Sequence, residues 1–299
     1  MTEPANNTAP LDDVRALVHK PIPLDTAPGG RVRAALLTMG REGDFGRLGE
    51  AAEWLANWQH RYPPRIEKPV LAIFAGSHGL VDEGVSLSTN TDTRAHVDAL
   101  REGRAPLSAI ATQAGANIRV FELALDNPTP SIAETAAMSD RECAATIAFG
   151  FEAIEDKPAL LAPPALSKRR VELVSRALTL HRGHLSDPLE ALRCLGGREL
   201  AACVGAIIAA RHEGVPVVLD GFATTIAAGV VHAIDPGAIS HCIASHCTQR
   251  PAHEAALERL GLKPLMQLEF QTGGGLGSAT AIGLLKTACA PFIAEPSAS

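Results

Sequence analysis

The feature that most constrains the fold is an alternation of short apolar runs with helical patterns, which continues from Val70 to Cys289. Such an alternation predicts strand–helix–strand crossovers and therefore a mainly parallel sheet in an α/β fold. The runs are nearly all apolar rather than alternating, as expected for strands that helices cover on both faces. The expected strands span residues 70–74, 118–123, 159–162, 215–219, 238–243 and 264–270.

Local signals place helices between these strands. Ser139, followed three residues later by Glu142, forms a capping box that opens a helix running to about residue 154. Asp187 and Pro188 supply an N-cap and a first-turn proline for a helix that Gly196 ends. The remaining expected helices span residues 11–18, 45–58, 167–181, 197–212, 222–234, 251–260 and 278–289.

Composition excludes several classes of function. The 299 residues carry a formal net charge of −6 and only 4% aromatic residues, which argues against nucleic-acid binding. The longest apolar stretch, residues 200–210, is too short to span a bilayer, and the N-terminus has no signal-peptide pattern. The six cysteines show no C-x-x-C spacing and lie mostly in apolar segments, as reduced core cysteines do. We therefore expect a cytoplasmic protein with no membrane or nucleic-acid partner.

Small and polar residues collect directly after four of the expected strands. Ligands of parallel sheets bind beyond the carboxyl ends of the strands, so these segments predict a ligand site at one edge of the sheet. The segments are Ala75-Gly76-Ser77-His78-Gly79 with Asp82-Glu83-Gly84-Val85-Ser86, then Asp220-Gly221, then Ser245-His246-Cys247-Thr248, and finally Thr272-Gly273-Gly274-Gly275-Leu276-Gly277-Ser278.

The last of these segments is rich in glycine and precedes the last expected helix. It can bring backbone N–H groups close to an anion at the start of that helix. As a dinucleotide-binding fingerprint it is weak, because Ser278 stands at the third glycine position and too little chain follows to complete a strand–helix–strand unit. A strand-to-helix turn without a ligand is the alternative.

The pairs His241-Cys242 and His246-Cys247 raise the question of a zinc site. Positions five apart on a strand point to opposite faces, so the two pairs do not converge on one ion. Buried cysteines with one polar histidine at the strand end are the favoured interpretation, and no metal is expected.

Three more titratable residues allow two interpretations each. His78 lies between glycines in a turn, which favours a hydrogen-bonding or ligand-facing side chain over a core one. Asp220 ends an apolar strand and needs partners, either in a binding role or as a helix N-cap. Glu269 lies in an expected strand and can simply face solvent.

A further set of segments, collinear over nearly the whole chain, carries a family resemblance. In order they are Leu11-Asp12-Asp13, Gly46-Arg47-Leu48, Phe74-Ala75-Gly76-Ser77-His78-Gly79 with Gly84-Val85-Ser86, Pro128-Thr129-Pro130, Ala137-Met138-Ser139, Leu195-Gly196-Gly197-Arg198-Glu199-Leu200-Ala201-Ala202, Val215-Pro216-Val217-Val218-Leu219-Asp220-Gly221-Phe222, Pro236-Gly237-Ala238 and Leu257-Glu258-Arg259-Leu260-Gly261-Leu262-Lys263-Pro264-Leu265. Together they resemble the nicotinate-nucleotide–dimethylbenzimidazole phosphoribosyltransferase family, which assembles the lower ligand of cobalamin.

The resemblance implies an architecture and a reaction. The architecture is a doubly wound, mainly parallel sheet with a small helical domain from both chain ends (residues 1–66 with 279–299, beside a large α/β domain of residues 67–278), usually as a homodimer. The reaction transfers a phosphoribosyl group from nicotinate mononucleotide to dimethylbenzimidazole or a related aromatic base, with inversion at the anomeric carbon and no metal or cofactor. In the family a glutamate is the general base, while amides of a glycine-rich loop and a lysine hold the phosphate.

Residue by residue, the resemblance implies a set of site positions and several departures. Gly274 stands at the glutamate of the family's G-E-G-x-G loop, and residues 163–168 replace its phosphate loop with a segment that opens on two prolines, which lack an N–H donor. Ser77 replaces an aspartate, and Ser88 and Thr89 replace an aromatic residue and a proline. The implied substrate-binding positions are Ser77, His78, Ser86, Ser88, Lys168 (matching the phosphate lysine), Asp220, Ser245, His246, Thr248, Gly273, Gly274 and Gly275.

Two functional hypotheses follow. In the first, the protein is an active phosphoribosyltransferase with a changed site that uses Glu83 or Glu269 as the base. Loss of one general base costs about 10²–10⁴-fold, so activity can survive that change. In the second, it is a catalytically degenerate relative that serves as a partner subunit in a heterodimer with an intact homologue, or that binds a nucleotide or aromatic base without turnover.

Overall fold

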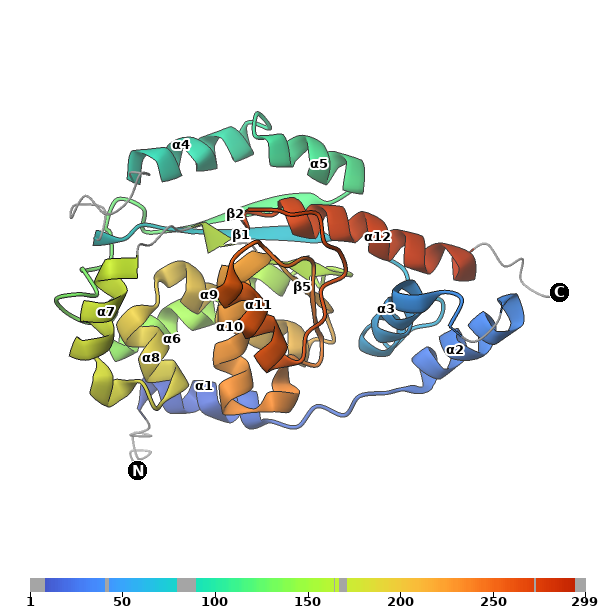
Figure 1. Cartoon of the computed structure of the whole chain (residues 1–299), viewed down its shortest axis with the longest axis horizontal. Coiled ribbons are helices and arrows are strands. Elements are labelled where there is room, and N and C mark those ends of the chain that lie inside the picture. The colour runs from blue at the N-terminus through green and yellow to red at the C-terminus, as the bar shows by residue number, and fades with distance from the viewer. Residues whose placement is uncertain are drawn as a thin grey trace, which may run out of the picture.

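A parallel β-sheet forms the centre of the molecule, as Figure 1 shows. The computed structural model describes residues 9–40, 43–79, 90–163, 165–166, 171–271 and 273–293. The strand order is β2-β1-β3-β5-β6, and the short β4 also pairs with β1. The strands are β1 (Val70–Gly76), β2 (Asn117–Leu123), β3 (Leu161–Ala162), β4 (Ala165–Leu166), β5 (Val217–Leu219) and β6 (Cys242–Ala244).

Helices lie on both sides of this sheet, which confirms the expected doubly wound α/β fold (Figure 1). The helices are α1 (Pro10–His19), α2 (Ala27–Met39), α3 (Gly46–Trp58), α4 (Asn90–Arg101), α5 (Pro106–Ala114), α6 (Asp140–Phe149), α7 (Val171–Leu180), α8 (Pro188–Leu195), α9 (Arg198–His212), α10 (Gly221–Ile234), α11 (Pro251–Leu260) and α12 (Leu276–Ile293). Short 3₁₀ turns η2 (Gly150–Ile154), η3 (Arg182–His184) and η4 (Pro236–Ile239) complete the connections.

Strand β1 contributes side chains to two separate hydrophobic cores, one on each face of the sheet. All seven of its residues are buried, and successive side chains point to opposite faces. Val70, Ala72 and Phe74 join the core that includes residues of α6, α9 and α10. Leu71 and Ile73 join the core on the other face, formed with residues of α5 and α12. This two-sided burial explains why the strand reads as an uninterrupted apolar run.

A small helical layer at one end of the molecule combines both chain ends. Helices α2 and α3 pack together and against the last part of α12, where Ala288 and Phe292 are buried with Val32 and Ala56. Helix α1 packs instead on α6 and α10, away from this layer (Figure 1). The division into residues 1–66 with 279–299 and residues 67–278 stays a prediction, and the packing of α1 favours placing that helix with the larger part.

Helix α12 is 18 residues long and, by length and composition alone, apolar enough to cross a membrane. Its residues Ala281, Ile282 and Leu285 are fully buried against the sheet. A buried helix of a folded core passes the same length and composition test, and the packing of α12 fits that description.

Two expected strands require correction. Residues 264–270 run beside β6, where Leu265 N–H donates to Ala244 O at 2.9 Å, but only the bridge between His246 and Met266 forms. The last backbone hydrogen bond to this neighbour is from Met266 N–H to Ser245 O at 3.1 Å, and Glu269 further along has a positive φ of +56°. Residues 236–239 form the 3₁₀ turn η4, which the Asp235 carboxylate caps by accepting from Gly237 N–H, so β6 begins only at Cys242.

Sequence patterns also missed helices α2, α4 and α5. Helix α2 begins Ala27-Pro28-Gly29-Gly30, and two glycines are poor helix formers. The glycines have a packing role: Gly29 N–H donates to Asn57 Oδ1 at 2.8 Å, and a Cβ at Gly29 would lie 2.3 Å from that oxygen. Close contact between α2 and α3 therefore overrides the local propensity.

Candidate functional site

Asp220 connects the end of strand β5 to the start of helix α12. Its side chain is 1% exposed. Oδ2 accepts a hydrogen bond from Gly275 N–H at 2.7 Å, and Oδ1 accepts one from Ser278 N–H at 2.8 Å. The carboxylate thus satisfies free amides at the positive end of an 18-residue helix. The N-cap alternative concerned the helix that follows Asp220, which is α10, but the Asp220 side chain makes no cap there. Its carboxylate instead accepts backbone N–H groups at the start of α12.

The glycine-rich segment is tied to Asp220 by close backbone contact. A Cβ at Gly273 would lie 2.9 Å from Asp220 O, and one at Gly221 would lie 2.9 Å from Gly273 Cα. Gly221, Gly274 and Gly275 also have φ values of +72°, +103° and +98°, which side chains disfavour. The anion that this segment holds in the structure is the protein's own carboxylate, so two of its amides are already engaged.

His246 follows strand β6 and lies against the same segment. A Cβ at Gly277 would lie 2.0 Å from His246 Nδ1, so only glycine fits beneath the imidazole. Ser245 Oγ lies 2.8 Å from Leu219 O and 2.8 Å from His246 Nδ1. Because a carbonyl oxygen only accepts, the serine hydroxyl donates to Leu219 and accepts from His246 Nδ1–H. His246 is therefore in the Nδ1–H tautomer, and its Nε2 carries the lone pair.

His253 of α11 forms a second fixed imidazole in this region. Its Nδ1 accepts from the backbone N–H of Thr248 at 3.0 Å, so the proton of the neutral ring is on Nε2. Nε2 then donates to Thr225 Oγ1 at 3.0 Å, and that hydroxyl donates to Gly221 O at 2.9 Å. The chain of bonds needs a neutral His253 and locks Thr248 beside the site.

Burial keeps both rings neutral. Desolvation lowers the pKa of His246, and the nearby Asp220 carboxylate acts in the opposite direction. Desolvation, reinforced by His246 and by Arg250, lowers the pKa of His253 to about 4. We call Asp220, Ser245, His246, Thr248, His253 and the segment 273–278 the β5–β6 cluster.

A second polar group lies at the end of strand β1. His78 Nε2 lies 3.1 Å from Oε1 of Glu199, a fully buried carboxylate in the first turn of α9. The other ring nitrogen, Nδ1, lies 3.4 Å from Thr129 Oγ1. Glycines make room for the pair: a Cβ at Gly76 would lie 2.6 Å from Glu199 Oε2, and one at Gly197 would lie 2.2 Å from His78 Cε1. Ser77 lies beside it, 3% exposed.

Both groups lie at the carboxyl edge of the sheet, since all its strands are parallel. Strand β3 separates β1 from β5, so two strand spacings, about 10 Å, lie between the two strand ends. The structure therefore brings Asp220, Ser245, His246, Thr248, Gly273, Gly274 and Gly275 together, and it places Ser77 and His78 further along the same edge.

The remaining predicted residues contribute less. Glu269 is exposed on the segment that leads into the glycine-rich segment. Glu83, Ser86, Ser88 and Lys168 lie outside the described residues. Where the family's phosphate loop was expected after β3, Ala165 and Leu166 continue alongside β1 as strand β4.

The positions of His241 and His246 argue against a zinc site shared by the two His-Cys pairs. His241 Nε2 donates to Ile207 O of α9 at 2.9 Å, whereas His246 faces Gly277 of α12. These helices belong to the cores on opposite faces of the sheet. The two pairs do not meet, as strand periodicity predicts.

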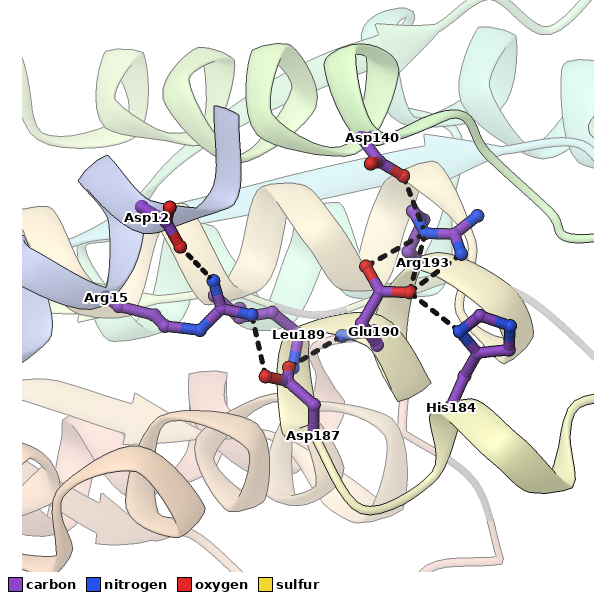
Figure 2. Close-up of polar contacts among 8 residues, drawn as sticks. All are labelled: Asp12, Arg15, Asp140, His184, Asp187, Leu189, Glu190 and Arg193. Carbon is purple, nitrogen blue, oxygen red and sulfur yellow. Dashed lines mark hydrogen bonds and ion pairs between the residues drawn. The ribbon is translucent and has the colours of Figure 1, made fainter. Parts of the chain in front are cut away.

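A third polar cluster, shown in Figure 2, joins helices α1, α6 and α8. Asp187 caps α8 by accepting from Leu189 N–H and Glu190 N–H, and it pairs with Arg15 at 2.7 Å. Glu190 pairs with Arg193 at 2.8 Å and with His184 at 3.0 Å. His184, Glu190 and Cys194 are close enough to hold a metal ion by distance alone. The Arg193 guanidinium already neutralises Glu190, so an ion-pair network describes the cluster better. We call it the α8 network.

Three residues at these two sites were not predicted from the sequence: Glu199 beside His78, and His253 and Phe270 at the β5–β6 cluster. A signal for the first was present: an acid directly before the apolar stretch 200–210 starts a helix that is buried almost throughout. For His253, the i, i+4 relation to Leu257 predicts a shared buried face. For Phe270, whose ring lies 5.0 Å from that of His246, no local signal existed.

Fold and site together define an α/β protein with a polar, glycine-lined site at the carboxyl edge of its sheet. A family model described as "Phosphoribosyltransferase" matches residues 31–162 and 162–295. The nicotinate-nucleotide–dimethylbenzimidazole phosphoribosyltransferase of Methylocella silvestris is 40% identical over 320 residues, covering 95% of this chain and 94% of the relative. The enzyme of the same name from Sinorhizobium fredii is 40% identical over 317 residues, covering 94% and 93%.

Solved structures agree with these matches. The crystal structure of the phosphoribosyltransferase of the same name from Thermus thermophilus has a TM-score of 0.80 at 27% identity and covers 89% of this chain and 95% of that one. The chain belongs to the phosphoribosyltransferase family.

Proposed function

We propose that this protein transfers a phosphoribosyl group from nicotinate mononucleotide to dimethylbenzimidazole or a related aromatic base, in the synthesis of the lower ligand of cobalamin. The observation that carries the proposal is the family match across both halves of the chain together with relatives of this name at 40% identity. The β5–β6 cluster supports it, because it gathers polar groups and glycines where ligands of parallel sheets bind.

The two polar groups at the sheet edge suit a substrate of nucleotide size. The β5–β6 cluster lies beyond β5 and β6, and the His78–Glu199 pair lies beyond β1. A ligand that spans them would place its ribose between the two, with the base at one end and the phosphate at the other. Ser77, Ser86, Ser88 and Lys168 remain predicted substrate-binding residues, and Glu83 and Glu269 remain predicted candidates for the base.

The proposal includes the surroundings of the enzyme. We expect a cytoplasmic homodimer, or a heterodimer with an intact homologue. We also expect the two-domain organisation described above, with the site in the large α/β domain.

The experiment is a turnover assay with the purified chain. Nicotinate mononucleotide and dimethylbenzimidazole are supplied together, and α-ribazole phosphate and free nicotinate are quantified by chromatography. We expect both products in equal amounts, dependent on both substrates. Substrate binding without either product, or product only in the presence of an intact homologue, would overturn the proposal in favour of a degenerate partner subunit.

A further inference from the structure

One polar atom of the β5–β6 cluster is left without a hydrogen bond. His246 is fully buried, and its Nε2 has no hydrogen-bond partner among the described residues. Its tautomer makes this atom a lone-pair acceptor, because Nδ1–H is committed to Ser245 Oγ. An unsatisfied buried acceptor costs about 1–3 kcal/mol, so its retention calls for an explanation.

The other polar groups of the cluster are already engaged. Both carboxylate oxygens of Asp220 accept backbone N–H groups, and Gly274 has no side chain to offer. His253 uses both ring nitrogens, towards Thr248 and Thr225. Within the described part of the β5–β6 cluster, His246 Nε2 is thus the buried side-chain polar atom that has no hydrogen bond.

Resting on the proposed function, we propose that His246 Nε2 binds the ring N–H of the incoming aromatic base and accepts its proton during phosphoribosyl transfer. His246 would then be a catalytic residue, in place of the exposed Glu269.

The step balances without any further reactant. The unprotonated ring nitrogen of the aromatic base forms a bond to the anomeric carbon of the ribose. The bond from that carbon to the nicotinate nitrogen breaks, and its electron pair leaves with nicotinate. The aromatic base becomes cationic, and the proton on its other nitrogen passes to Nε2. The Asp220 carboxylate stabilises the resulting imidazolium.

The surroundings of His246 favour an aromatic donor. The Phe270 ring lies 5.0 Å from the imidazole at an interplanar angle of 72°, and the His253 ring lies 6.2 Å away at 89°. A flat heterocycle suits such surroundings as the donor, because aromatic rings pair favourably in edge-to-face and offset arrangements. Phe270, Gly273 and Gly274 are only half-buried, so the cover next to His246 borders on solvent.

Two substitutions separate the two ring nitrogens. His246→Asn places an amide near Nδ1, keeps a partner for Ser245 and removes the acceptor at Nε2. His246→Gln places an amide oxygen near Nε2, where it can accept a hydrogen bond but not a proton. His241→Gln is the matched control, because it replaces another fully buried imidazole on the opposite side of the sheet.

The measurements are dimethylbenzimidazole binding by calorimetry and turnover. For His246→Asn we expect binding about tenfold weaker and kcat lower by about 10²–10⁴-fold. For His246→Gln we expect binding within about threefold of the wild type and the same loss of kcat. Unchanged binding and kcat in His246→Asn, or equal losses in His241→Gln, would overturn the proposal.

Two further outcomes keep the proposal separate from the proposed function. A wild-type protein that makes no product overturns the proposed function, yet selective loss of dimethylbenzimidazole binding in His246→Asn would still support the contact. Spectra of the wild-type protein with ¹⁵N-labelled histidine avoid any folding defect. Added dimethylbenzimidazole should shift the Nε2 resonance of one Nδ1–H histidine, and no shift would overturn the proposal.

Discussion

The α8 network and the β5–β6 cluster show two ways in which this chain uses polar side chains. In the α8 network (Figure 2), charged groups of opposite sign pair at partly exposed positions, with Arg15 and Asp187 at 30% and 35% side-chain exposure. In the β5–β6 cluster the groups are nearly all buried, and the only formal charge among the hydrogen-bonded side chains is Asp220.

The difference separates a structural from a functional arrangement. Glu190 has Arg193, His184 and solvent as partners, so its carboxylate needs no ligand to satisfy its hydrogen bonds. His246 Nε2 lacks both a protein partner among the described residues and access to solvent. A buried acceptor without a hydrogen bond is costly, and a donor group of a ligand would satisfy it.

The largest expected effect comes from Asp220→Asn. The amide nitrogen would face a backbone N–H, so one of two charge-assisted bonds becomes a donor–donor contact. We expect the free energy of unfolding to fall by about 3 kcal/mol, measured by urea denaturation. Asp126→Asn, at an exposed ion pair, is the control and should change stability by less than about 0.5 kcal/mol. Equal effects would contradict the structural role of Asp220.

The buried histidines and the carboxylates of the α8 network should respond to acid in different pH windows. The pKa of His253 is lowered to about 4, that of His241 to about 3 and that of His246 is also lowered, all by burial first. Below their usual value of 6.5 the unfolded chain binds more protons, so stability should fall as the pH drops from 6.5 towards 4.

The carboxylates of the α8 network titrate later. Hydrogen bonds from Arg193 lower the pKa of Glu190. For Asp187, burial acts to raise the pKa, but hydrogen bonds from the Glu190 backbone amide and from Arg15 outweigh it, so that the pKa is lowered. Their contribution is present above pH 4.5 and is lost as the pH falls through the lowered values. Unfolding measured at pH 7.5, 6 and 5 should therefore report on the buried histidines, and a flat profile would contradict their neutral state.

Two glycines of α12 provide a sharper comparison within one helix. Gly277→Ala would bring a Cβ to 2.0 Å from His246 Nδ1, so the ring must move, and we expect a loss of about 2 kcal/mol. Gly283→Ala meets nothing within 4 Å and should stabilise the protein by about 0.5–1 kcal/mol. Thermal denaturation distinguishes the signs, and a stable Gly277→Ala protein would place His246 elsewhere.

A smaller loss of stability is expected at the α8 cap. Asp187→Ala removes the acceptor for Leu189 N–H and Glu190 N–H and should cost about 1 kcal/mol of unfolding free energy. Asp187→Ser keeps the cap but loses the Arg15 pair and should cost less. Turnover should be unchanged in both variants. A loss of kcat would show that the α8 network is coupled to the site.

What the sequence could predict depends on the range of the interaction. The caps at Ser139 and Asp187 involve neighbours within three residues, and both formed as expected. Strand β1, which helices cover on both faces, is an uninterrupted apolar run and was predicted from it. The partly exposed segment 264–270 was also predicted as a strand, but it forms only one bridge to its neighbour.

The site was predicted as a set of positions but not as a set of interactions. Asp220 bonds to Ser278 across 58 residues, and His78 bonds to Glu199 across 121. No local pattern encodes such contacts. The tautomer of His246 depends on a carbonyl of the neighbouring strand, so its open acceptor became visible only in the folded chain.

The most direct test of the account is a crystal structure with nicotinate mononucleotide and dimethylbenzimidazole bound. We predict the aromatic base beside Phe270 with its ring N–H within hydrogen-bond distance of His246 Nε2, and the ribose between the β5–β6 cluster and the His78–Glu199 pair. Substrates bound at another surface, with the β5–β6 cluster still closed around Asp220, would contradict it.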